Sequence, residues 1–169
     1  MKAILKFFKE RWLKFFPKEN GASSNGDNRE APRSAKSQIA WRGEYEIGYE
    51  PIDTQHKALL QTIMKLETVV ANDRDNREAI VTALDEITQY ALHHFKTEEE
   101  LMVEMAYPDI ENHIDQHFAF TAKSIKFMHD ALQGTLDVNK LLSFMQSWWA
   151  AHVLQEDFAY RSCIPNIYR

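Results

Sequence analysis

The chain has 169 residues, enough for one domain with a hydrophobic core and further tail segments. Its net charge of −5 argues against a nucleic-acid binder, and its single cysteine, Cys163, excludes both an intramolecular disulfide and a multi-cysteine metal site. Only five glycines and five prolines interrupt the sequence, so we expect an all-α protein.

The first element in chain order is a basic amphipathic helix expected over residues 1–18. The segment "MKAILKFFKERWLKFFPK" carries six basic residues and one acid, and Pro17 ends the helical pattern. An anionic membrane surface and a groove on a partner protein both fit its aromatic, apolar face, and packing on its own domain is the third alternative. That face comprises Ile4, Leu5, Phe8, Trp12, Phe15 and Phe16.

A flexible linker is expected over residues 19–38, before a compact domain at 39–169. Small and polar residues dominate "GASSNGDNREAPRSAKSQ", and large apolar residues are absent from it. The three segments therefore have different compositions and different expected structures.

Four helices are predicted within the compact domain from the spacing of its apolar residues. The breaks between them are short and contain turn and capping residues, such as Gly134 and Asp137. Connections this short force neighbouring helices to run antiparallel, which predicts an up-down-up-down four-helix bundle. The expected helices span residues 53–71, 76–104, 109–131 and 138–160.

Histidines occur in all four predicted helices, at positions that can face the bundle core. Residues four apart share one helix face, and two pairs with this spacing are present in "HFKTE" and "HIDQH". Burying so many imidazoles and carboxylates without a cation would leave polar groups without partners. The set exceeds what one tetrahedral zinc needs, and mixed nitrogen and oxygen donors suit two first-row ions, with iron the leading choice. These residues are His56, His94, Glu98, His113, His117 and His152.

The carboxylate of the fourth helix is ambiguous from spacing alone. Glu156 is four residues after His152 and shares its face on a regular helix, whereas Asp157 is five residues after it and points about 140° away. A wide turn of the π type, which often occurs at functional sites, would instead bring Asp157 into the core.

Four motifs resemble the hemerythrin family, and in particular the bacterial hemerythrins. They are "IGYEPIDTQHKALL", "HFKTEEELM", "YPDIENHIDQHFAF" and "WWAAHVLQEDFAY", in family order and spacing, and the resemblance covers residues 41–160. It implies a hemerythrin-like bundle that holds an oxygen-bridged pair of iron ions. The family's aspartate lies five residues after its last histidine, so the resemblance favours Asp157.

The resemblance also implies which residues hold which iron. His113, His117 and His152 would hold the first iron, and His56 and His94 the second, with Glu98 and Asp157 bridging both. The two-histidine iron would keep an open position inside a dry pocket. By the same resemblance the pocket wall comprises Leu59, Phe95, Trp148 and Val153, and Trp149 departs from the family pattern and could narrow the pocket.

The function that the resemblance implies is reversible dioxygen binding, for transport, storage or delivery, with residues 1–18 determining the location. An enzyme acting on peroxide or nitric oxide is the alternative, but no additional acid, base or redox thiol accompanies the motifs, so a non-enzymatic role is expected. A redox or oxygen sensor would need an output, for which only the N-terminal helix is available. The expected location is the cytoplasm, peripheral to the inner membrane if residues 1–18 bind lipid.

Overall fold

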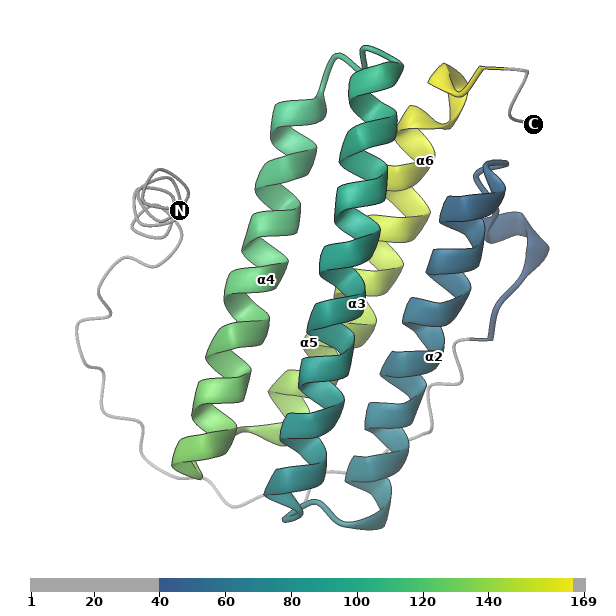
Figure 1. Cartoon of the computed structure of the whole chain (residues 1–169). Coiled ribbons are helices and arrows are strands. Elements are labelled where there is room, and N and C mark those ends of the chain that lie inside the picture. Colours follow the sequence, from purple (N-terminus) through teal and green to yellow (C-terminus); the bar gives the residue numbers. More distant parts are fainter. Residues whose placement is uncertain (1–39, 166–169) are drawn as a thin grey trace. The chain divides into compact units, whose positions relative to one another are not determined.

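Four long helices form an antiparallel bundle in the computed structural model, which describes residues 40–165 (Figure 1). The fourth column of the bundle is composite, because a π-helical turn, His152–Glu156, joins α5 to the short helix α6. The described residues contain no strand, and the prediction of an all-α, up-down-up-down bundle is confirmed. The helices are α2 (Glu50–Asn72), α3 (Arg77–Glu104), α4 (Ile110–Gln133), α5 (Val138–Ala151) and α6 (Asp157–Tyr160).

The helix ends follow the local chemistry of the sequence. The side chains of Asn76 and Asp137 cap α3 and α5 by accepting hydrogen bonds from backbone N–H groups three residues on. Gly134 ends α4 in the left-handed region, with φ 74°. The first helix begins three residues earlier than predicted, because Pro51 is tolerated within the first turn.

Inward-facing side chains at helical spacing build the core between the helices. On α2, for example, Leu59, Ile63 and Leu66 are all buried. The helix α2 packs against α3 and α5, and α3 packs also against α4. The same inward faces carry buried polar side chains in the half of the bundle near the α3–α4 connection.

An apolar cluster closes that end of the bundle. It joins the segment before α2 to the ends of α3 and α6, and Asp53 anchors this segment by accepting hydrogen bonds from the backbone N–H groups of Ile47 at 2.7 Å and Gly48 at 3.1 Å. The buried members are Ile47, Ile52, Leu101, Met102, Tyr160 and Ile164. Apolar side chains therefore cover this end of the core.

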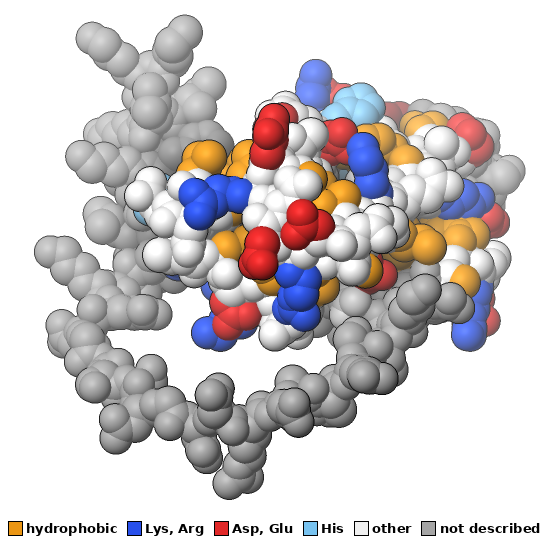
Figure 2. All heavy atoms as spheres, turned by 90° about the horizontal axis from the view of Figure 1, so that it is seen from below, with side chains coloured by type: hydrophobic (Ala, Val, Ile, Leu, Met, Phe, Trp, Pro, Cys, Tyr) orange, Lys and Arg blue, Asp and Glu red, His pale blue; other side chains and the backbone are white. Residues whose placement is uncertain are grey.

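The opposite end, seen in Figure 2, has a mixed surface. Acidic and basic side chains of the described residues alternate there, with apolar side chains between them. This face therefore carries no extended charge of one sign. Within residues 40–165 no helix is both long enough and apolar enough to cross a bilayer.

The predicted amphipathic helix at 1–18, with its apolar face, and the predicted linker at 19–38 lie outside the described residues. The boundaries of these segments and of the domain at 39–169 stay predictions.

Candidate metal centre

Seven polar side chains from all four columns of the bundle meet in its core. Each has at most 3 % of its surface exposed, which is unusual for histidines and rarer for carboxylates. The structure thus brings together the whole predicted ligand set. The residues are His56 on α2, His94 and Glu98 on α3, His113 and His117 on α4, His152 in the π-helical turn and Asp157 on α6.

The seven side chains form two overlapping groups, and in each group the possible ligand atoms lie within 4.8 Å of one another. One group combines Glu98 with three histidines, and the other combines Glu98 and Asp157 with two. Asp157 also approaches the first group, with Oδ1 3.3 Å from His113 Nε2. Both carboxylates therefore reach both groups, and the histidines divide three to two. The groups are Glu98, His113, His117 and His152, and His56, His94, Glu98 and Asp157.

The π-helical turn places Asp157 rather than Glu156 in the cluster. Asp157 is fully buried, and its Oδ1 lies 3.4 Å from Nε2 of His152. Glu156 is half-buried and accepts a hydrogen bond from Nε2 of Gln116 at 2.8 Å. The widened turn adds one residue between His152 and the carboxylate, as the π-type alternative required.

Several of the possible ligand atoms in the cluster have no hydrogen-bond partner. Buried nitrogen or oxygen atoms with no hydrogen-bond partner occur at five of its seven residues, although such atoms are rare in native cores. Their number and convergence fit two cations, which would bind the carboxylate oxygens and one ring nitrogen of each histidine. These atoms belong to His56, His94, Glu98, His113 and Asp157.

Three histidines, His56, His113 and His117, are shifted toward the protonated form in the metal-free protein. Burial lowers the pKa of His56, but the nearby carboxylates of Asp157 and Glu98, at 3.0 and 3.7 Å from its Nε2, outweigh burial and raise it to about 9. The same opposing effects raise the pKa of His113 to about 9. Burial lowers the pKa of His117, but its contacts with Glu98 and Glu99 outweigh burial and raise it. We call His56 and His113 the high-pKa pair.

The other groups are shifted toward the forms that bind metal. Burial lowers the pKa of His94 to about 4, with Glu98 offsetting only part of the effect. Burial likewise lowers the pKa of His152 to about 4. For Asp157, burial raises the pKa, but the neighbouring histidines, His152 first, outweigh it and bring the pKa to about 2. We call His94 and His152 the low-pKa pair; both are neutral at pH 7, whereas the high-pKa pair must release protons before binding metal.

Four further side chains hold the predicted ligands in place. The amide oxygens of Gln55 and Gln116 accept hydrogen bonds from Nδ1 of His94 and His152, each at 3.1 Å. Glu99 Oε1 lies 2.9 Å from Nδ1 of His117, and the Tyr160 hydroxyl donates to Glu98 Oε1 at 2.5 Å. Neither glutamine was predicted as part of the site, although each directly precedes a predicted ligand histidine, in "TQH" and "DQH".

Aromatic rings cover part of the cluster. Phe95 stacks on His117 with a centroid distance of 3.9 Å, and Trp148 stacks on His152 at 4.5 Å. Leu59 and Val153 are fully buried. Trp149 is buried too, and its described ring contacts are with Trp41 and Tyr45, at 6.5 and 5.8 Å. Its influence on a ligand pocket stays a prediction.

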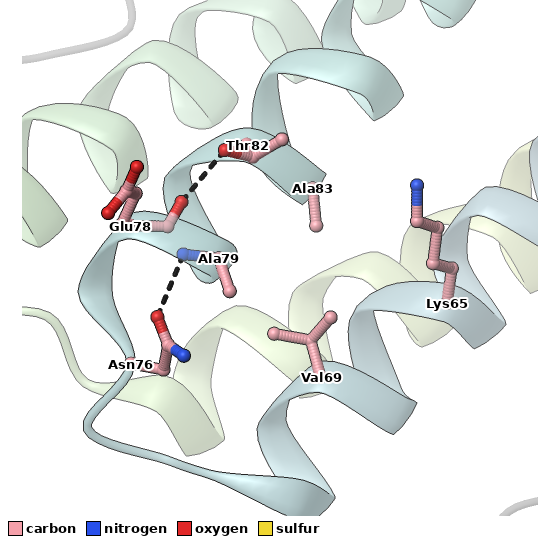
Figure 3. Close-up of a pocket in the computed structure, with 7 residues that line it drawn as sticks. All are labelled: Lys65, Val69, Asn76, Glu78, Ala79, Thr82 and Ala83. Atoms are coloured by element: carbon pink, nitrogen blue, oxygen red, sulfur yellow. Dashed lines mark hydrogen bonds between the residues drawn. The ribbon is translucent and has the colours of Figure 1, made fainter.

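A surface depression of about 400 Å³ lies near the opposite end of the bundle, between α2 and the start of α3 (Figure 3). Figure 3 shows the Asn76 cap and a hydrogen bond from Thr82 to the Glu78 carbonyl, both of which belong to the first turns of α3. None of the predicted site residues lines it. Its lining residues are Lys65, Val69, Asn76, Glu78, Ala79, Thr82 and Ala83.

Known proteins with the same sequence pattern and fold share this arrangement of helices. Residues 47–163 match the family model described as "Hemerythrin HHE cation binding domain". A bacteriohemerythrin of Stenotrophomonas maltophilia is 29 % identical over 72 % of this chain and 78 % of its own length. A myohemerythrin of Riftia pachyptila is 28 % identical over 74 % and 92 %. A crystal structure of wild-type hemerythrin superposes with a TM-score of 0.68 and 26 % identity, covering 75 % of this chain and 98 % of the other.

Proposed function

We propose that this chain, which belongs to the hemerythrin family, binds dioxygen reversibly at a non-haem di-iron centre and serves as an oxygen carrier or store. The observation that carries the proposal is the buried seven-donor cluster, with its histidines divided three to two. An uneven division leaves one metal with fewer protein donors than the other. That difference provides a position for an exogenous ligand.

The donors would hold two iron ions in the following way. His113, His117 and His152 would bind one ion, and His56 and His94 the other. The carboxylates of Glu98 and Asp157 would bridge the two. When bound, a pair of ferrous ions supplies the electrons that reversible dioxygen binding requires.

The remaining residues keep the site dry and its ligands oriented. Phe95 and Trp148 lie against the ligand rings, and the buried Leu59 and Val153 add apolar surface. The Tyr160 hydroxyl donates a proton in a hydrogen bond to Glu98 and fixes that carboxylate. The contacts of Gln55, Gln116, Glu99 and Tyr160 with the ligand set orient its side chains, which supports ligand binding rather than turnover as the chemistry of this site.

The test is metal analysis combined with absorption spectra of the full chain, taken reduced, then oxygenated, then purged with inert gas. We expect about two irons per chain and an oxygen-dependent charge-transfer band that disappears on purging. His94→Ala should remove the band, whereas His93→Ala, one residue away and exposed, should leave it unchanged. Irreversible oxidation on the first exposure to oxygen, or zinc in place of iron, would contradict the proposal.

The location of the protein is a separate part of the proposal and rests on the sequence of residues 1–18. Their basic, aromatic pattern supports attachment to an anionic membrane surface or to a partner protein, which would place the oxygen supply near a consumer. Deleting residues 1–20 should release the protein from the membrane fraction without changing its spectrum. Identical fractionation of the deleted and full-length chains would rule out this role.

A further inference from the structure

The two groups of possible ligands orient one histidine each through the same kind of contact. We call the group with His113, His117 and His152 the three-histidine half of the site, and the group with His56 and His94 the two-histidine half. In each half, a glutamine that directly precedes one ligand reaches across to a histidine on the next column. Gln55 on α2 accepts from His94, and Gln116 on α4 accepts from His152, both at 3.1 Å. Both acceptors are neutral amides, so this contact gives neither half of the site a higher metal affinity than the other.

The symmetry between the halves breaks at the ligands that follow these glutamines. Nδ1 of His117 lies 2.9 Å from Oε1 of Glu99, whereas Nδ1 of His56 has no hydrogen-bond partner among the described residues. The residues that follow the two carboxylates of the cluster differ in the same sense. Glu99 follows the shared carboxylate Glu98, but the residue that follows Asp157 is Phe158, which cannot accept a hydrogen bond.

An anionic acceptor changes a histidine ligand more than a neutral one does. A hydrogen bond from Nδ1–H to a carboxylate fixes the tautomer, keeps Nε2 free for metal and increases its basicity. Bonds to ionised groups are also shorter and stronger than those to amides. The Glu99 side chain is 34 % exposed, so solvent screens part of its charge while the hydrogen bond itself is retained.

We propose that Glu99 is a positioning residue that gives the three-histidine group the higher metal affinity, so that the first divalent ion binds to Glu98, His113, His117 and His152. The inference rests on the metal centre of the proposed function and is independent of dioxygen binding. Loading then has an order, in which the three-histidine half fills before the half with the open position.

The direct test titrates Co²⁺ into the metal-free full chain without oxygen and follows the visible absorption of the bound ion against a competing chelator. We expect two binding steps in the wild type. Glu99→Ala should weaken the first step by roughly 10- to 100-fold and leave the second unchanged. Glu99→Gln, which keeps an acceptor but removes the charge, should have a first-step affinity between those of the wild type and Glu99→Ala.

Glu100→Gln is the matched control, because it removes the same charge one residue away. The Glu100 side chain is 70 % exposed and lies 3.7 Å from Lys96, outside the cluster. Its titration should equal that of the wild type. An equal effect of both glutamine variants, or equal weakening of both steps, would assign the result to general electrostatics and overturn the proposal, as would an unchanged Glu99→Ala titration.

Imidazole NMR with one equivalent of Zn²⁺ identifies the half that fills first. The ring signals of His117 and His152 should shift to bound positions while those of His56 and His94 stay free. Bound signals appearing first at His56 and His94 would overturn the proposal. If oxygen spectra failed while this order held, the proposed function would be wrong and the loading order would stand.

Discussion

Removing the Tyr160 hydroxyl should lower the free energy of unfolding and remove the hydrogen bond that holds Glu98 in the cluster. Tyr160 is fully buried, and its hydroxyl donates to Glu98 Oε1 at 2.5 Å. Burial raises the pKa of Tyr160 well above its usual value, so the hydroxyl stays a donor at every working pH. Tyr160→Phe keeps the ring in its contacts with Tyr107 and His113 but leaves a buried carboxylate oxygen without its donor.

The magnitude follows from the charge and burial of the acceptor. A hydrogen bond to a charged group contributes about 1.5–3 kcal/mol to the free energy of unfolding. For a domain of this size each kcal/mol changes Tm by about 4 °C, so the metal-free variant should melt roughly 6–12 °C lower.

Thermal and urea unfolding of the metal-free protein measure this effect. Tyr107→Phe is the matched control, since it removes the same group from a half-buried ring whose centroid lies 6.0 Å from that of Tyr160. The control should change stability by less than about 0.5 kcal/mol. Equal stabilities of Tyr160→Phe and the wild type would refute the reasoning and remove Tyr160 from the site.

Three further predictions follow from the site and the helix ends. Asp157→Asn should reduce bound iron below two per chain, whereas Glu156→Gln should keep the wild-type content, and metal analysis of both variants decides between the two acids. Gly134→Ala should cost about 1–2 kcal/mol in urea unfolding, because its φ is 74° and a Cβ would meet the Arg77 guanidinium, while Gly43→Ala, with no atom within 4 Å, should cost little. In the metal-free protein, the high-pKa pair stabilises the fold below its unfolded pKa of about 6.5, and this contribution is lost as pH rises through about 9. The low-pKa pair acts oppositely and loses its contribution as pH falls from about 6.5 through about 4, so Tm should peak near pH 6.5, and a constant Tm between pH 6.5 and 9 would contradict these shifts.

The bundle was predictable from the sequence because its helices carry apolar residues at regular spacing and short, capped connections. The pairs His94 with Glu98 and His113 with His117 were predictable for the same reason, since a spacing of four is unambiguous on a regular helix. The start of α2 was predicted less accurately. The predicted helix starts at residue 53, but proline is allowed in a first turn, so the helix begins at Glu50 and includes Pro51.

Contacts between distant segments were not predictable by spacing. Gln55 and His94 are 39 residues apart, and only the packing of α2 on α3 brings the amide to the imidazole. Spacing along α3 does not determine whether Glu99 is exposed to solvent or contacts a histidine of the cluster. The position of His117 on the next helix decides between them.

The π-helical turn shows why a regular fourth helix would not complete this site. Asp157 must face two other columns, because its Oδ2 lies 3.0 Å from His56 Nε2 on α2 and its Oδ1 lies 3.3 Å from His113 Nε2 on α4. On a regular helix Glu156, four residues after His152, would share the face of that histidine. In the structure Glu156 instead accepts a hydrogen bond from Gln116 at the edge of the site. The widened turn separates the two donors of this column, so that His152 serves one metal group while Asp157 reaches both. The irregular spacing that made the sequence ambiguous is therefore the feature that lets one column place His152 in one group of possible ligands and Asp157 within reach of both.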